Sequence, residues 1–260
     1  SFNTFIISNK RNLKFKLQFF LILFFFPYLK PSDSFIYNTF NNHGAIGLIN
    51  LPTARFYSES VHGITLYRGK PDKKITLTSN PYDWLEASFF YTSIQGKLYC
   101  DQIDDLVCSQ SYKDKGFNFK LRIKEEGSLP AIAIGINDIA GTGFYSSEYI
   151  VSSYGINNID MHFGLAWGTL NGSDNSFSNP LGKIYDGFYS RPTEFADEGG
   201  QFQLSRYFSD EEVSPFYGFS YIFNEKLIIQ FERDTTVSPG RVGYDESKSS
   251  FSYGFDYSFN

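Results

Sequence analysis

The side chains that could do chemistry are few, and most of them follow one pattern. Lys120, Arg122 and Lys124 recur at every second position. Alternate residues of a β-strand share one face, so these three cations form a basic ladder. We assign that face to the interior of the fold, together with four acids, which are Glu86, Asp160, Glu232 and Asp256.

Two interpretations of these charges are open. In the first, the charges stabilise the interior, and each cation is paired with an acid or a hydrogen-bond acceptor. In the second, unpaired cations face water and form a track for an anionic sugar polymer. The two differ in whether the charges are paired residue by residue.

A histidine adds one catalytic candidate. His162 lies two residues after Asp160 on the same strand face, so the pair could act as a general base and its orienting carboxylate. No serine is marked as a nucleophile, and a hydrogen-bonded structural histidine explains the same pattern. We therefore predict no catalytic residue and expect the protein not to be an enzyme.

Two loops carry further candidates. Cys100 and Cys108 flank three aspartates, and in an oxidising compartment the cysteines could form a local disulfide. The aspartates could bind calcium, but acids in a loop are ordinarily solvated, so we predict no metal site. Residues 141–146 resemble a dinucleotide-binding loop that lacks its third glycine and its helix, so we predict no cofactor.

The composition favours strands as the elements that position these residues. The chain has 260 residues, 19% of them aromatic, and a formal net charge of −5. A nucleic-acid binder would carry a basic excess, so no nucleic-acid partner is expected. The 22 Gly, 10 Pro, 29 Phe and 19 Tyr favour strands and turns over a helical bundle.

Most of the chain alternates between apolar and polar residues. Residues 117–124 place Phe and aliphatic side chains on one face and Asn, Lys and Arg on the other. Residues 251–259 place five aromatic side chains opposite Ser, Gly and Asp. This period of two predicts β-strands.

Such strands fit either a soluble β-sandwich or a transmembrane β-barrel. Three features favour the barrel: large aromatic outer faces, charges mixed with Gly, Ser and Ala on the inner faces, and segments of about ten residues, enough for a tilted strand to cross a bilayer. Lipid cannot satisfy an open sheet edge, so the barrel must close. We predict an all-β fold, an antiparallel transmembrane β-barrel of about 12 strands, with a range of roughly 10–14.

The segment before the barrel is assigned in two parts. Residues 10–16 contain four cations and residues 17–29 contain no charge, which is typical of a secretory signal peptide, with a buried core helix as the alternative. We predict a signal peptide over 1–34, a lead-in segment over 35–61 and the barrel over 62–260. The lead-in contains Pro52, which argues against a central strand, and it is either periplasmic or lumenal. If it is lumenal, we expect Arg55 to bond a lumenal acid.

The loops suggest the strand count. Eleven segments alternate, including residues 201–208, and the long connections are at 96–114, 170–200 and 234–248. Long loops of such barrels share one side. The last connection would lie on the wrong side unless residues 183–189 added a twelfth strand.

Several motifs resemble a known family. Residues 44–55, GAIGLINLPTAR, resemble the opening motif of the YjbH-type outer-membrane proteins of exopolysaccharide and capsule production. Further motifs match the family in the same order at residues 80–87, 110–116, 129–135, 141–149, 164–168 and 191–192. The resemblance runs from about residue 43 to residue 259.

The resemblance implies an outer-membrane β-barrel of a Gram-negative bacterium that assists exopolysaccharide or capsule biosynthesis or export, as a conduit, gate or scaffold. It implies no catalytic residues. The expected partners are outer-membrane lipids, the barrel-assembly machinery, polysaccharide and other export proteins. Family members are longer, with a second barrel, and some resemble lipoproteins with a cysteine that this chain lacks after its apolar run. A general porin-like channel and a barrel enzyme acting on lipid or sugar are the alternatives.

Overall fold

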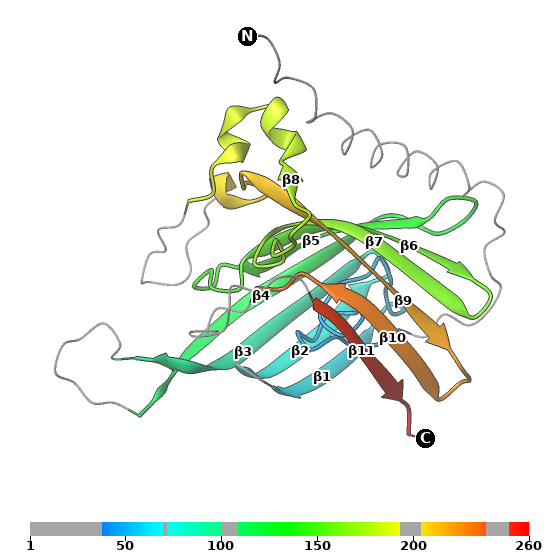
Figure 1. Ribbon diagram of the computed structural model, residues 1–260. Coiled ribbons are helices and arrows are strands. Elements are labelled where there is room, and N and C mark those ends of the chain that lie inside the picture. The colour runs from blue at the N-terminus through cyan, green and yellow to red at the C-terminus, as the bar shows by residue number, and fades with distance from the viewer. Residues whose placement is uncertain (1–37, 70–71, 100–108, 193–203, 238–249, 260) are drawn as a thin grey trace, which may run out of the picture.

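The computed structural model describes residues 38–69, 72–99, 109–192, 204–237 and 250–259 (Figure 1). The predicted signal peptide and the two cysteines, Cys100 and Cys108, lie outside these residues. Within them, no helix is long and apolar enough to cross a membrane. Strands make up most of the described chain.

The strands form one antiparallel sheet. They are β1 (Val61–Arg68), β2 (Asp72–Tyr82), β3 (Leu85–Leu98), β4 (Ser111–Lys124), β5 (Ala131–Ile139), β6 (Ser147–Ile156), β7 (Ile159–Gly168), β8 (Phe177–Ser178), β9 (Glu212–Ile222), β10 (Leu227–Asp234) and β11 (Ser250–Tyr257). The main path runs β1-β2-β3-β4-β5-β6-β7-β9-β10-β11, and β8 pairs only with β9. The predicted all-β, antiparallel architecture is confirmed.

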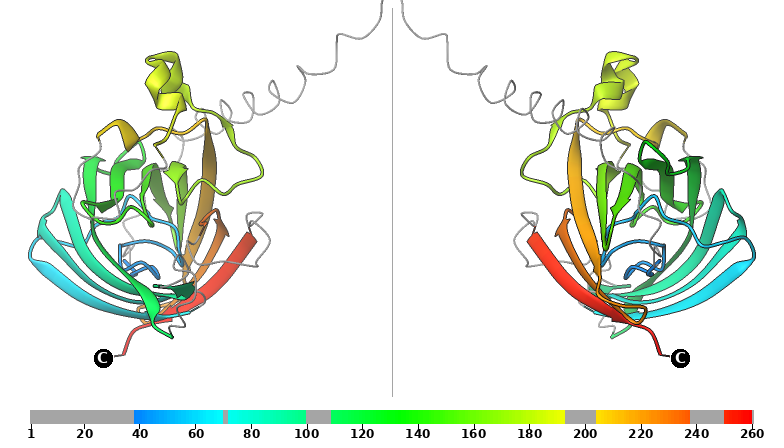
Figure 2. Two further views of the ribbon diagram at one scale, coloured as in Figure 1. Left: turned by 90° about the vertical axis from the view of Figure 1, so that its left-hand side faces the viewer. Right: turned by 90° about the vertical axis from the view of Figure 1, so that its right-hand side faces the viewer.

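The alternation in sequence becomes an alternation in burial. In β4, Asn118 and Lys120 are buried, whereas Phe117 and Phe119 are exposed. In β11, Tyr253 and Phe255 are 85% and 76% exposed. The sheet is curved, as Figure 2 shows. Many aromatic and aliphatic side chains of its strands are exposed, whereas polar side chains at the alternate positions are buried. The sandwich alternative is wrong, because these aromatic side chains would then meet in a dry core.

The sheet is curved but not closed. Its path ends at β1 and β11, and no pairing joins these two strands among the described residues. The predicted closure is therefore absent from this structure. The path contains ten strands, an even number, so an antiparallel meander leaves β1 and β11 running in opposite directions.

Short turns and long connections lie at opposite ends of the sheet. The turn end carries residues 83–84, 125–130, 157–158 and 223–226, and the loop end carries the connections β3–β4, β5–β6, β7–β9 and β10–β11. All long connections thus share one end without a twelfth long strand. The eleven strands of the sheet fall within the predicted range.

The expected strand over 183–189 is wrong. The 3-10 helices η2 (Pro180–Lys183) and η3 (Asp186–Tyr189) occupy this region, because Asn179 caps the amide of Leu181 and Pro180 starts the helical turn. The expected strand at 201–208 is also wrong in its described part, where η4 (Leu204–Arg206) is a 3-10 helix. Removing this strand, rather than adding one, gives the observed order of loops.

Residues 38–60, which we call the inner segment, lie inside the curve of the sheet (Figure 2). The segment forms only isolated bridges, between Phe40 and Ile46 and between Gly47 and Pro52. Its Ile46, Leu48 and Leu51 are almost fully buried. The segment therefore packs against the concave side of the sheet.

Candidate functional site

The inner segment is held by carboxylates of the sheet, and Glu232 on β10 makes the most contacts. Its carboxylate accepts hydrogen bonds from three consecutive amides, those of Ile49 (3.1 Å), Asn50 (2.9 Å) and Leu51 (3.1 Å). Glu232 is fully buried. A buried carboxylate needs hydrogen bonds in place of its hydration. Here the inner segment supplies them.

A buried ion pair between Glu86 on β3 and Lys120 on β4 also binds the inner segment. Lys120 Nζ lies 2.9 Å from Glu86 Oε2, and both side chains are buried. The Glu86 carboxylate accepts the amide of Ile46 at 3.2 Å, and Lys120 donates to the carbonyl of Ile46 at 3.1 Å. The two backbone groups of one residue thus complete a buried ion pair.

Arg55 pairs with Asp160, an acid on the concave face of the sheet. Its guanidinium donates from Nε and Nη2 to the two oxygens of Asp160, at 2.9 and 2.6 Å. Nη2 also lies 2.5 Å from Glu126 Oε2. Burial alone would lower the pKa of Arg55, but the carboxylates of Asp160 and Glu126 outweigh burial and raise it. Arg55 therefore stays charged and links the inner segment to β7 and to the β4–β5 turn.

His162 belongs to the same contact region. Its Nδ1 lies 2.8 Å from Ser153 Oγ, and its Nε2 lies 3.6 Å from Asp160 Oδ2. Ser153 Oγ accepts the amide of Ala54 at 2.9 Å, and Ser153 is directly opposite His162 in the β6–β7 register. These contacts fit the structural interpretation of His162, because its hydrogen-bonded partner Ser153 holds the inner segment.

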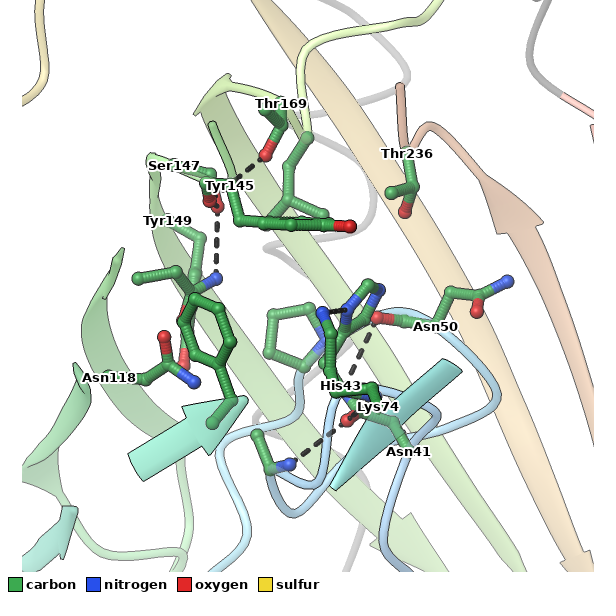
Figure 3. Close-up of a pocket in the computed structure, with 15 residues that line it drawn as sticks. Asn41, His43, Asn50, Lys74, Asn118, Tyr145, Ser147, Tyr149, Thr169 and Thr236 are labelled. Atoms are coloured by element: carbon green, nitrogen blue, oxygen red, sulfur yellow. Dashed lines mark hydrogen bonds between the residues drawn. The ribbon is translucent and has the colours of Figure 1, made fainter. Parts of the chain in front are cut away.

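A small hollow lies between the inner segment and the sheet, towards the loop end, and Figure 3 shows its lining. Lys74 Nζ lies 3.1 Å from His43 Nδ1 and 3.9 Å from the centroid of the Tyr145 ring. Burial, and next the charge of Lys74, lower the pKa of His43 well below its ordinary value. A neutral His43 can accept the hydrogen bond of Lys74, whereas a protonated one cannot.

The other predicted interior residues, Arg122, Lys124 and Asp256, form no hydrogen bond to the inner segment among the described residues. Arg122 Nη1 pairs with Glu125 at 2.8 Å, and its guanidinium carbon lies 4.7 Å from the centroid of the Phe56 ring. Lys124 donates to the carbonyls of Glu125 and Leu129, within the β4–β5 turn. Asp256 is partly buried on β11, and burial followed by the charges of Asp256 and Glu86 raises the pKa of Tyr57.

Each of the three cations of the basic ladder thus has a polar partner. Of the basic ladder, Lys120 is bound to Glu86, Arg122 to Glu125, and Lys124 to carbonyls. This arrangement favours the first interpretation, a charged network that stabilises the interior. It does not form a continuous track of unpaired cations.

A cap covers the loop end of the sheet. It comprises residues 169–192 and 204–211, seen above the sheet in Figure 1. Arg191 Nη1 lies 2.8 Å from Glu148 Oε2, and Glu148 is fully buried on β6. The Asn179 amide donates to the carbonyls of Phe188, Phe208 and Asp210 at 2.9, 3.0 and 3.1 Å. These contacts fix the described parts of the cap to each other and to the sheet.

Several residues of the site were not predicted from the sequence. Ser153 and Lys74 lie on inward strand faces, and alternation could have placed them there. Glu148 lies on the opposite face of β6 from Ser153, and its burial depends on the cap residue Arg191. Glu126 lies in a turn, where alternation has no meaning. The contact of His43 with Lys74 was not predictable either, because the two residues lie 31 positions apart in sequence.

Comparisons with known proteins agree with the motifs. The model of the YjbH family, described as exopolysaccharide biosynthesis protein YbjH, matches residues 39–260 and so includes nearly all of the inner segment. A protein of Escherichia coli (strain K12), described as uncharacterized lipoprotein YjbH, is 32% identical over 160 residues. The match covers 61% of this chain and 23% of that protein, so this chain aligns with less than a quarter of its relative. No solved structure matches this chain.

Proposed function

The chain belongs to the YjbH family of exopolysaccharide biosynthesis proteins, and from this premise we propose that it is an outer-membrane β-barrel that serves polysaccharide export as a gate. The inner segment is the closed gate, and the concave face of the sheet is the lumen. The family supports a role in exopolysaccharide biosynthesis. The exposed apolar side chains of the sheet support the membrane location, and the binding of the inner segment by Glu232 supports the gate.

The observation that carries the gate is the binding of the inner segment by Glu232. Three consecutive amides of the segment donate to this one buried carboxylate. Glu86 and Asp160 bind the segment from two other strands. A polymer could cross the lumen only if these contacts opened together. Contacts between charged groups and hydrogen-bond donors can re-form in water, which suits a reversible closure.

The exposed apolar face supports the membrane location. Residues of β1, β4 and β11 present Ile64, Leu66, Phe119, Tyr253 and Phe255 to the outside. An apolar surface this extensive is costly in water and favourable in lipid. The E. coli relative carries the description lipoprotein, which is consistent with a location in the Gram-negative envelope. Short turns of such barrels are periplasmic, so the turn end would face the periplasm.

In the membrane, β1 and β11 would have to pair, because lipid leaves open sheet edges unsatisfied. Their opposite directions permit antiparallel pairing. The inner segment already touches both strands: Phe40 packs against Gly63 of β1, and Ile49 packs against Gly254 of β11. A larger residue at Gly63 would displace the ring of Phe40, and one at Gly254 would need only a small shift of the Ile49 side chain. The segment thus positions the two edges for closure.

The decisive experiment replaces the chromosomal gene with Glu232→Gln and with a deletion, and weighs the surface polysaccharide. The deletion should lower the yield strongly, because the gate is lost from the export route. Glu232→Gln should change the yield and raise single-channel conductance in planar bilayers, because its amide holds the three donors less tightly. Glu225→Gln, an exposed acid in the β9–β10 turn, is the matched control.

Unchanged polymer yield in the deletion would refute the proposed function. A porin-like channel predicts the opposite conductance result. It would conduct small ions in the wild type, and Glu232→Gln would add little. A closed wild type that opens in Glu232→Gln would therefore separate the gate from the porin.

A further inference from the structure

The turn end of the interior contains a second hollow, of about 320 Å³. It lies between the inner segment, which contributes Asn38, Arg55 and Phe56, and the β4–β5 region, which contributes Arg122, Glu125 and Glu126. This volume lies at the lower end of the ~300–1,000 Å³ typical of small-ligand pockets. Neither the family description nor the relative's name assigns a ligand to it.

The hollow offers guanidinium donors that the protein does not use. Arg55 is 8% exposed and spends Nε and Nη2 on acids, while its Nη1 has no hydrogen-bond partner among the described residues. Arg122 spends only Nη1, on Glu125. A guanidinium edge matches the two oxygens of a carboxylate better than any neutral group.

One acceptor accompanies these donors. The Oδ1 atom of Asn38 is buried and has no hydrogen-bond partner among the described residues, although its Nδ2 donates to the carbonyl of Phe56 at 2.7 Å. An acceptor of this kind requires a donor such as a hydroxyl group. A small ligand that carries both a carboxylate and hydroxyl groups would satisfy Arg55, Arg122 and Asn38 together.

The carboxylates of Glu125 and Glu126 pair with the two arginines of this site, in positions that a ligand carboxylate could take. The Glu125 side chain is 72% exposed, and its pair with Arg122 links residues three apart on the surface. Such exposed pairs are weak and readily exchanged. Glu126 is more buried and also accepts the amide of Gly155 at 3.2 Å, so it remains in place. An incoming carboxylate would therefore replace Glu125 and not Glu126.

We propose that this hollow binds an acidic sugar residue, of the uronic acid class, within an anionic polysaccharide. The proposal rests on the proposed function, because the turn end faces the periplasm only in the orientation given above. The ligand carboxylate binds Arg122 and Nη1 of Arg55, and a sugar hydroxyl donates to Asn38. Arg55 and Asn38 belong to the inner segment. Binding of the polymer would therefore change the contacts of the segment that forms the gate.

The test is calorimetric titration of the folded protein in detergent micelles with tri-galacturonate. Arg122→Gln should weaken binding at least tenfold, because it removes the positive charge and the paired N–H donors of the guanidinium group. Glu125→Gln should tighten binding several-fold, because it removes the competing carboxylate. The matched control is Lys226→Gln, an exposed cation of another turn at the same end, which should leave binding unchanged. Maltotriose, which has hydroxyl groups but no carboxylate, should bind at least tenfold more weakly than tri-galacturonate.

Three results would overturn the site. Arg122→Gln and Lys226→Gln could weaken binding equally. That result would indicate that the anionic ligand is attracted to the cations of the turn end in general and not to one site. Inorganic phosphate could bind as tightly as tri-galacturonate, which would indicate an anion site without sugar specificity. Tri-galacturonate could fail to bind the wild type. None of these outcomes depends on polymer yield. The binding site could therefore be refuted while the proposed function stands, and the proposed function could be refuted while the binding site stands.

Discussion

Glu232 Oε1 accepts the backbone amide of Asn50 at 2.9 Å, although the two residues are 182 positions apart in the chain. The contact joins β10, the ninth strand of the sheet path, to the segment that precedes the first strand. It is one of three amide contacts to the same carboxylate. The inner segment is thus held by a strand near the far end of the chain, and its position depends on the tertiary structure of the sheet.

Removing this carboxylate should release the inner segment. Glu232→Ala leaves three amides without their acceptor, and each buried unsatisfied donor costs about 1–3 kcal/mol. We expect the free energy of unfolding to fall by at least about 3 kcal/mol, and trypsin to cleave after the otherwise buried Arg55. Wild-type protection in Glu232→Ala, measured by mass spectrometry of the tryptic fragments, would show that other contacts hold the segment.

Arg55 and Asp160 should behave as a coupled pair. Removing one partner of a buried ion pair leaves an uncompensated charge and costs about 3–5 kcal/mol. We expect Arg55→Met and Asp160→Leu each to destabilise the protein strongly, and the double variant to be less destabilised than their sum. Chemical unfolding of the four proteins measures the coupling. Additive losses would contradict a direct interaction, because Glu126 would then be the main partner of Arg55.

Acid should loosen the inner segment through His43. The pKa of His43 is lowered from 6.5, so below about this pH the unfolded chain binds more protons than the folded one. The stability from neutral His43 is therefore present above pH 6.5 and is lost as the pH falls towards the lower, folded-state pKa. We expect Tm to fall over this window.

The His43 effect has a matched control. In His43→Gln the Oε1 atom can still accept from Lys74 but does not titrate, so the pH dependence of Tm should flatten. His62 is exposed and pairs with Ser79, so His62→Gln should keep the wild-type pH profile. An identical slope for all three proteins would place the acid sensitivity elsewhere.

The convex face should be intolerant of charge only in a bilayer. Phe119 is on this face of β4 and is 39% exposed. An arginine near the bilayer midplane costs a barrel about 2–4 kcal/mol, so Phe119→Arg should lower the folding free energy in lipid vesicles by about that amount. Tyr185→Arg, in the cap, should have little effect. Equal and small effects of the two substitutions in vesicles would argue against a membrane-facing sheet.

The two edge strands should be neighbours in the folded membrane protein. A cysteine at Thr65 of β1, combined in turn with cysteines at Ser252, Gly254 and Asp256 of β11, should form a disulfide in one combination. All three β11 residues face the interior side. Cys100 and Cys108 are replaced by Ser in this background. Oxidation followed by gel electrophoresis detects the product, and its absence from every combination in membranes would mean that the barrel stays open.

Alternation alone determined the local features of this protein. The two faces of 117–124 and 251–259 follow from the sequence, because successive side chains of a strand point in opposite directions. The inward placement of Glu86, Lys120, Asp160 and Glu232 was predictable for the same reason. The motif at 44–55 marked the inner segment before its position was known.

Features that depend on other parts of the chain could not be predicted in this way. The order of the loops predicts a strand over residues 183–189, but Asn179 and Pro180 start the 3-10 helix η2, and η3 follows at Asp186–Tyr189. The sequence shows that Ser153 faces inward, but only the β6–β7 register places it opposite His162. Turn residues such as Glu126 carry no periodic signal, so their pairing with Arg55 was not visible.

The sequence by itself thus determined which side chains face lipid-like or polar surroundings, since that depends only on backbone geometry over a few residues. Only the tertiary structure decided which buried charge meets which donor. The curvature of the sheet brings Glu86, Asp160 and Glu232 around one segment of the chain, and local sequence does not encode that distance.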